Sequence, residues 1–129
     1  NYEAGMTGLT GHNDMRDVIA KIESGDKEAL LAYQMYAYRI RKYIGAYTAA
    51  LNGLDAIIFT GGIGENDCLM RKLCSTNLEY LGIQFDEEKN NSPLKQLREI
   101  NTDNSSVRVL VIPTNEELEI AMQCYNLLD

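Results

Sequence analysis

The chain has 129 residues, 45% of them hydrophobic and 24% charged, as expected for one globular domain with a buried core. Its net charge of -7 and the absence of any field of Lys and Arg exclude a basic nucleic-acid-binding surface. No apolar run reaches the roughly 18 residues of a membrane span, and no basic-then-apolar leader is visible, so we expect neither membrane binding nor secretion. Cys68, Cys74 and Cys124 match no zinc spacing, and we expect reduced, mostly buried thiols in a cytoplasmic protein.

The first residues, "NYEAGMTGLTGHND", contain neither an initiator Met nor a clear first element, so we interpret the chain as a segment of a longer protein. Gly5, Gly8 and Gly11 among small polar residues predict a loop over residues 1–12. Asn13 is the expected cap of a helix that ends at Ser24 and Gly25. The apolar residues of this helix recur at helical spacing: Met15, Val18, Ile19 and Ile22.

Residues 27–51 predict the longest helix, with Asp26 as its cap and with Asn52 and Gly53 at its end. Spacings of three and four alternate along it and place one set of residues on a single stripe: Leu30, Tyr33, Ala37, Ile40, Ile44, Tyr47 and Leu51. Five of the eight tyrosines lie on this helix. Burial within the domain and contact with a partner protein both explain them.

The sequence "LDAIIFT" at 54–60 predicts a buried, parallel strand, and "TGGIGEN" at 60–66 overlaps its end. Ligands of open α/β sheets bind beyond the carboxyl ends of strands, where Gly61, Gly62 and Gly64 would let a flat or anionic ligand approach the backbone. A tight, closely packed turn is the alternative. The run is neither a dinucleotide motif nor a phosphate loop, no Lys follows it, and Glu65 repels phosphates unless a metal intervenes. A nucleoside or α-phosphate contact is therefore favoured over a γ-phosphate cradle.

The rest of the chain continues the alternation of helices and strands. Asn66 is the expected cap of a helix over 67–80 that Gly82 ends, with Leu69, Leu73, Leu78 and Leu81 inward or near its end. We then expect a small strand at 83–85, an exposed helical turn with loops over 86–106, a strand at 107–113 and a final helix at 116–128. This order predicts a single α/β domain over 1–129, a sheet with crossover helices.

Two short polar stretches contain further candidates for a site. Thr114 and Glu117 have capping-box spacing, whereas Glu116 has no task beyond the helix dipole and is a candidate Mg²⁺ ligand. In "NDMRD", Asp14 and Asp17 are ordinary partners of a helix dipole. Arg16 is either a solvated residue or a guanidinium that stacks on a base.

Taken together, these stretches resemble the C-terminal portion of the acetate kinase family. The resemblance rests on four segments in the family's order and spacing: "GHNDMRDV", "YQMYAYRIRKYIGAYTAALNGLDAIIFTGGIGEN", "LEYLGIQFDEEKN" and "VRVLVIPTNEELEIA". It implies a partial, ribonuclease-H-like domain of the actin, sugar kinase and Hsp70 superfamily. It also implies part of a homodimeric, cytoplasmic enzyme that interconverts acetate and ATP with acetyl phosphate and ADP, using Mg²⁺.

The resemblance also assigns site residues by matching motifs. Those of the nucleotide site would be Asp14, Met15, Arg16, Gly62, Ile63, Gly64, Glu65 and Asn66, and Glu116 would be the magnesium-associated carboxylate. The family's N-terminal domain and its catalytic residues are not in this chain, and His12 does not replace them. We therefore assign no catalytic residue and expect the chain alone to be inactive. A propionate or butyrate kinase, or a non-catalytic dimerisation module, remains the alternative.

Overall fold

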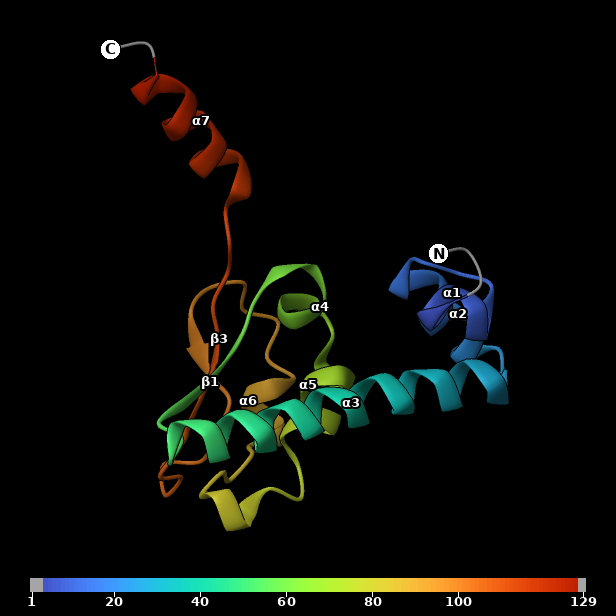
Figure 1. The fold of residues 1–129 in the computed structure, drawn as a ribbon, viewed down its shortest axis with the longest axis horizontal. Helices are drawn as coiled ribbons and strands as arrows, with labels where there is room; N and C mark the ends of the chain where they lie inside the picture. Colours follow the sequence, from blue (N-terminus) through green and yellow to red (C-terminus); the bar gives the residue numbers. More distant parts are fainter. Residues whose placement is uncertain (1–3, 128–129) are drawn as a thin grey trace.

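The computed structural model describes residues 4–127 and contains one three-stranded sheet within them (Figure 1). Strand β1 (Ala56–Phe59) runs parallel to β3 (Arg108–Val111), with Phe59 opposite Val111, as the two apolar runs predict. Strand β2 (Arg98–Glu99) pairs antiparallel with β3 on its other side, giving the order β1-β3-β2. The expectation of only a helical turn and loops over 86–106 is therefore wrong at β2, because a strand of two residues has no periodicity to detect.

The described residues also form seven α-helices, with one 3-10 turn after the fifth. They are α1 (Gly5–Thr10), α2 (Met15–Glu23), α3 (Lys27–Leu51), α4 (Gly61–Asn66), α5 (Cys68–Ser75), η1 (Glu79–Leu81), α6 (Glu87–Asn90) and α7 (Glu116–Asn126). The connection from β1 to its parallel neighbour β3 passes through α4, α5, α6 and β2, as the predicted crossover requires.

Helix α1 lies where the sequence predicts a loop, although residues 1–3 of that stretch are outside the described residues. Gly11 ends the helix instead of preventing it: at φ +75° it is left-handed, and its N–H donates to the carbonyl of Thr7. Met6 of α1 packs against the core cluster that contains Tyr33. Burial of this face stabilises a helix that its local composition does not predict.

Acidic residues cap the helices at which asparagine is expected. Asp14, not Asn13, caps α2 by accepting from the N–H of Arg16 at 2.8 Å, and Asp67, not Asn66, caps α5 by accepting from Met70 at 2.9 Å. Asp26 caps α3 as predicted. Each error is one residue toward the N-terminus, and each true cap adds a negative charge at the positive end of its helix.

Helix α3 has the predicted bounds, but its apolar stripe is buried only in part. Tyr33 and Ala37 are buried, whereas Tyr47 is 61% and Leu51 is 73% exposed. Helices α1, α2 and α5 pack against α3 (Figure 1), and its buried residues all lie in its first half. Periodicity finds the face of a helix, but only the neighbouring elements determine how far along the helix that face is covered.

The segment after α4 is broken into shorter elements than expected. Helix α5 ends at Ser75, Asn77 takes a left-handed conformation, and η1 follows before Gly82 ends the segment at φ +87°. The expected strand at 83–85 is reduced to one antiparallel bridge, between Phe85 and Asn101. The expectation of mostly buried thiols is also wrong, because only Cys74 is buried, while Cys68 and Cys124 are exposed.

Two clusters of buried residues form the core. The first lies among α2, α3 and α5: Val18, Ala29, Tyr33, Ala37, Met70 and Cys74. The second lies around the sheet: Leu78, Ile83, Ile100, Val107, Val109 and Val111. Phe59, at the end of β1, packs against both clusters and so connects the helical layer to the sheet.

The buried hydroxyl of Tyr33 joins α3 to the junction between α4 and α5. Its Oη lies 2.7 Å from both carboxylate oxygens of Asp67, which ends α4 and caps α5. Burial, together with the hydrogen bond to Asp67, raises the pKa of Tyr33, so the phenol stays protonated and donates. A hydrogen bond to a carboxylate therefore helps to hold α4 and α5 in position against α3.

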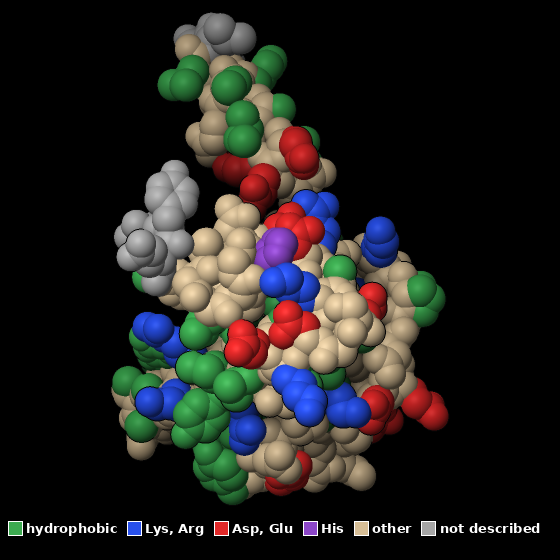
Figure 2. All heavy atoms as spheres, turned by 90° about the vertical axis from the view of Figure 1, so that its right-hand side faces the viewer, with side chains coloured by type: hydrophobic (Ala, Val, Ile, Leu, Met, Phe, Trp, Pro, Cys, Tyr) green, Lys and Arg blue, Asp and Glu red, His purple; other side chains and the backbone are tan. Residues whose placement is uncertain are grey.

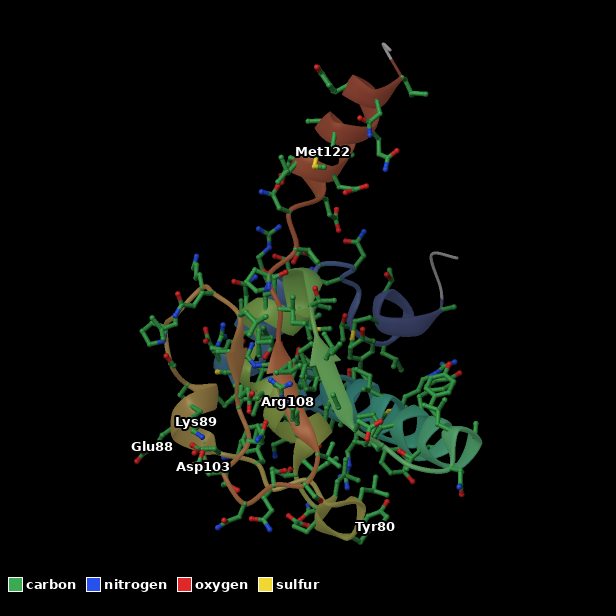
Figure 3. The ribbon with its side chains drawn as sticks, turned by 90° about the vertical axis from the view of Figure 1, so that its left-hand side faces the viewer. Tyr80, Glu88, Lys89, Asp103, Arg108 and Met122 are labelled. Atoms are coloured by element: carbon green, nitrogen blue, oxygen red, sulfur yellow. The ribbon has the colours of Figure 1, made fainter. Side chains whose placement is uncertain are left out.

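Helix α7 projects away from the other elements. It follows a short extended linker after β3 (Figure 1), and Figure 3 shows Met122 on it, well clear of the sheet. Every described residue from Glu116 to Asn126 is exposed. The bounds agree with the predicted final helix apart from its last residues, of which 128 and 129 lie outside the described residues. None of the helices in residues 4–127 has the length and apolar character that crossing a bilayer needs.

Replacing Tyr33 by Phe should lower the free energy of unfolding by about 1.5–3 kcal/mol, because the substitution removes the hydrogen bond to the Asp67 carboxylate without changing the packed ring. Urea denaturation monitored by circular dichroism measures it. Tyr38→Phe is the matched control, since Tyr38 lies on the same helix and is 64% exposed. Equal effects of the two substitutions would show that the Tyr33 hydroxyl does not hold the α4–α5 junction.

Candidate functional site

A hollow of about 680 Å³ lies between the start of α2 and helix α4. Its lining comes from two stretches far apart in the sequence: Asn13, Asp14, Met15, Arg16 and Ile19 from the first, and Gly62, Ile63, Asn66 and Asp67 from the second. The structure therefore brings "DMR" and "GGIGEN" together at one place. Of the predicted nucleotide-site residues, only Gly64 and Glu65 are not part of this lining.

Asp14 and Arg16 form a bidentate pair on the α2 side of the hollow. The Arg16 Nε lies 3.0 and 3.1 Å from the two Asp14 carboxylate oxygens, and its Nη2 also donates to Asp14. The side-chain hydrogen bond from Arg16 holds the pKa of Asp14 down at about 2, so the carboxylate stays charged. The Arg16 side chain is 89% exposed. The ion pair thus holds the Arg16 guanidinium at the rim of the hollow, and the planar shape of this group allows it to stack on a flat ring.

Apolar side chains form the inner surface of the hollow. Met15 and Ile19, one turn apart on α2, and Ile63 of α4 all line it and also pack against the core cluster around Tyr33. Contact with close-packed core residues limits their movement. An apolar wall with a few polar groups at its edge is the usual composition of a small-molecule site.

The three glycines of "GGIGEN" have three different roles. Gly61 is left-handed at φ +70°, a conformation that L side chains rarely adopt. A Cβ on Gly64 would lie 3.0 Å from the backbone carbonyl carbon of Phe59, so close packing leaves no room for a side chain at this position. Gly62 lines the hollow, and a Cβ added there would meet no atom within 4 Å. Close packing explains Gly64, backbone conformation explains Gly61, and Gly62 is the one of the three that lines the hollow.

Glu65 points to the start of the α7 segment. Its Oε1 accepts from the N–H of Gly61 at 3.0 Å and from both the N–H and the hydroxyl of Thr114 at 2.9 Å each. These bonds, the backbone one from Thr114 foremost, lower the pKa of Glu65. The predicted capping box of Thr114 and Glu117 is wrong, because Thr114 donates to Glu65 and Asn115 caps α7.

Two further residues of this region are not found from the sequence. Asp67 lines the hollow and holds Tyr33, and its place directly before a helix is a capping signal that Asn66 obscures. Arg71 is 2% exposed and donates from Nη1 to the carbonyls of Gly64 and Glu65, at 2.9 Å each. Its Nε donates to Asn90, and burial lowers the pKa of Arg71. No pattern in the sequence distinguishes this Arg from a solvated one.

Glu116 occupies the first position of α7 and is exposed, with Glu117 and Glu119 in the same turn. Within residues 4–127, His, Cys, Asp and Glu nowhere gather in a group of three or more that could hold a metal ion. A Mg²⁺ ion at Glu116 would therefore take most of its ligands from outside the described residues, as is common for an ion that proteins hold through one or two carboxylates.

Comparison with known proteins defines the class and then the family. By fold the chain is a mixed α/β, partial domain of the actin-like ATPase class. It superposes on Porphyromonas gingivalis acetate kinase with a TM-score of 0.87 and 40% identity, covering 98% of this chain and 32% of that one. For a propionate kinase from Francisella tularensis subsp. tularensis the TM-score is 0.78 at 42% identity, covering 92% of this chain and 30% of that one.

Residues 1–122 match the Acetokinase family, and the chain belongs to this family. It is 58% identical to an acetate kinase of Flavobacterium johnsoniae over 127 residues, which are 98% of this chain and 32% of that protein. An acetate kinase of Oleidesulfovibrio alaskensis is 51% identical, over 99% of this chain and 32% of that protein. The chain thus spans about a third of the length of the curated relatives that it matches.

Gly64→Ala should destabilise the chain relative to Gly62→Ala by about 1–3 kcal/mol, because the new methyl group meets the backbone of Phe59 in the first case and open space in the second. Both positions lie in α4, so the gain in helix propensity is shared and cancels in the comparison. Urea denaturation of the two variants measures the difference. If Gly62→Ala were the more destabilising, the division of roles among the glycines would be wrong.

Proposed function

We propose that this chain is the nucleotide-binding part of an ATP-dependent acetate kinase, which transfers the γ-phosphoryl group of ATP reversibly to acetate and gives acetyl phosphate and ADP. The main support for the proposal is that residues of "DMR" at the start of α2 and of "GGIGEN" in α4 line the same hollow. Family membership and the relatives named acetate kinase support the reaction.

In this proposal the nucleoside end of ATP or ADP occupies the hollow. Met15 and Ile63 provide an apolar wall for the base, and the Arg16 guanidinium stacks on it while Asp14 holds the guanidinium in place. Gly62 allows the ribose or base to approach the backbone, and Asn66, whose amide donates to the carbonyl of Gly62 at 2.9 Å, keeps that turn in shape. Gly64 and Glu65 belong to the site through the packing and hydrogen bonds of α4.

The charge of the lining favours the nucleoside over the phosphates. Asp14 and Asp67 are acidic, and Arg16 is the single basic residue among those that line the hollow. Phosphoryl transfer needs cationic groups and metal ions directed at the transferring phosphate. We therefore propose that the chain anchors the nucleotide without catalysing the reaction alone, and that the rest of the whole protein supplies the catalytic groups and binds acetate.

We further propose that Mg²⁺ accompanies the nucleotide, with Glu116 as one carboxylate ligand or as an acceptor for a metal-bound water. The ion would neutralise charge on the phosphate oxygens. A cytoplasmic location agrees with the supply of ATP and with the free thiols at positions 68, 74 and 124. The structural likeness to a propionate kinase leaves propionate or butyrate as the alternative acyl substrate.

Gly62→Val should weaken binding of fluorescent ADP to this chain at least tenfold and leave its far-UV circular dichroism unchanged, because the isopropyl group fills the open side of the hollow. Fluorescence anisotropy with and without Mg²⁺ measures the affinity, and Gly45→Ala, on α3 and away from the hollow, is the control. If the Gly62→Val variant bound ADP with the same affinity as the parent chain, the hollow would not be part of the nucleotide site.

Turnover is tested in a chimera in which residues 1–129 replace the matching third of the Flavobacterium johnsoniae enzyme. The chimera should form acetyl phosphate from acetate and ATP, and this chain alone should not. Assays with propionate and butyrate separate the acyl substrates. A chimera that is folded but inactive toward all three acids would contradict the proposed reaction.

A second surface, on α3, supports a proposed homodimer. Met35, Tyr38, Tyr43 and Tyr47 are between 49% and 64% exposed, and a shallow hollow of about 580 Å³ runs between Met35 and Ala46. Tyr43 stacks on Tyr47, and the Arg39 guanidinium lies 5.9 Å from the Tyr43 ring centre. Figure 2 shows hydrophobic side chains gathered with basic ones between them low on this side of the molecule. Tyr, Met and Arg are enriched in the centres of protein interfaces.

Tyr38→Glu should shift the chain from dimer to monomer at micromolar concentration, because it places a charge among the exposed tyrosines of α3. Sedimentation velocity over a range of concentrations measures the change. Tyr80→Glu is the control, since Tyr80 is 78% exposed on η1, outside this surface. A parent chain that stays monomeric at high concentration would contradict the dimer.

A further inference from the structure

The carboxyl ends of β1 and β3 place two functional segments side by side. The strands are parallel neighbours, so α4, which follows β1, and the linker to α7, which follows β3, leave the sheet at the same edge (Figure 1). The linker continues the pairing for one residue, with the N–H of Ile112 donating to the carbonyl of Phe59 at 2.9 Å. The hydroxyl of Thr60 then donates to the carbonyl of Ile112 at 2.9 Å.

Glu65 makes the last contact before α7 begins. One carboxylate oxygen receives the N–H of Gly61, at the start of α4, and both donors of Thr114, which lies two residues before α7. Hydrogen bonds to an ionised carboxylate are about twice as strong as neutral ones. A single charged oxygen therefore joins the helix that lines the hollow to the base of the helix that carries Glu116.

Within residues 4–127, no residue of helix α7 is buried. All its described side chains are exposed, including Leu118, Ile120 and Met122 (Figure 3). Within residues 4–127, four hydrogen bonds hold the linker that leads to α7, two of them through Glu65 and two through Ile112.

We propose that Glu65 is a positioning residue, which sets the direction of α7, and with it Glu116, relative to the nucleotide hollow. The effect on catalysis rests on the proposed function: if a nucleotide binds at Gly62, a helix fixed in this way holds Glu116 at a constant distance from it. Glu65 then acts through Thr114 and touches neither the base nor the ribose.

The chain offers a natural pair of labelling sites for testing the direction of α7. Cys68 on α5 and Cys124 on α7 are exposed, whereas Cys74 is buried, and its burial raises the thiol pKa to about 12, so it stays unlabelled. Spin labels on Cys68 and Cys124 report the distribution of distances between the two helices by pulsed electron paramagnetic resonance.

In this experiment Glu65→Ala, which removes the acceptor of all three hydrogen bonds, should at least double the width of the distance distribution. Thr114→Val, which keeps the N–H but lacks the hydroxyl, should broaden it less, and Thr114→Ser, which keeps both donors, should match the parent. A parent-like width in Glu65→Ala overturns the proposal. If that variant does not fold, the comparison of Thr114→Val with Thr114→Ser decides, and equal widths overturn it.

Kinetics in the chimera separate positioning of α7 from binding of the nucleotide. Glu65→Ala should lower kcat at least tenfold with the KM for ATP within threefold of the parent, whereas Gly62→Val should raise that KM. A rise in KM alone for Glu65→Ala would place Glu65 in the nucleotide pocket and overturn the positioning role. An inactive parent chimera, or a parent chain that does not bind ADP, counts against the proposed function and leaves the distance measurement to decide the role of Glu65.

Discussion

The hydrogen bond between Tyr33 and Asp67 is the constraint on which the site depends. It is made inside the helical core, and it fixes the point at which α4 ends and α5 begins. The hollow exists because α4 stands at a set distance from the start of α2, and both elements pack on the part of α3 that carries Tyr33. Arg71 also supports α4 by donating hydrogen bonds to the carbonyls of Gly64 and Glu65.

Residues that look alike in the sequence have separate tasks in the structure. Gly61 adopts a left-handed backbone conformation, Gly64 allows close packing against Phe59, and Gly62 leaves the backbone accessible from the hollow. Among the carboxylates, Asp14 orients a guanidinium, Asp67 fixes a helix junction and Glu65 joins two strand ends, so three acids near one hollow do not make a metal site. The lining that results is apolar with a slight excess of negative charge, which suits a nucleoside better than a chain of phosphates.

Local signals in the sequence predict what depends on local physics. The bounds of α3 follow from its caps, and β1 and β3 follow from short apolar runs, so these elements and their parallel pairing are predicted. The family resemblance predicts six of the nine residues that line the hollow, whereas the local pattern alone indicates Gly62, and no spacing relates Arg16 to Gly62. The predictions that are wrong concern residues whose structure depends on distant neighbours. Packing of Met6 against the core stabilises α1, β2 forms by pairing with β3, and Glu65 accepts hydrogen bonds from Thr114 instead of lining the hollow.

The isolation of α7 has a thermodynamic consequence of its own. With eleven residues and no buried side chain, it is shorter than the about 12–15 residues at which isolated helices become even marginally stable in water. The Asn115 cap and the bond from Gln123 to Glu119 are its own local supports. We therefore expect its helix–coil equilibrium to be nearly independent of the core, and its amide protons to exchange with solvent faster than those in the buried first half of α3. A surface that covered its apolar residues would make that local equilibrium part of the cooperative unfolding of the whole protein.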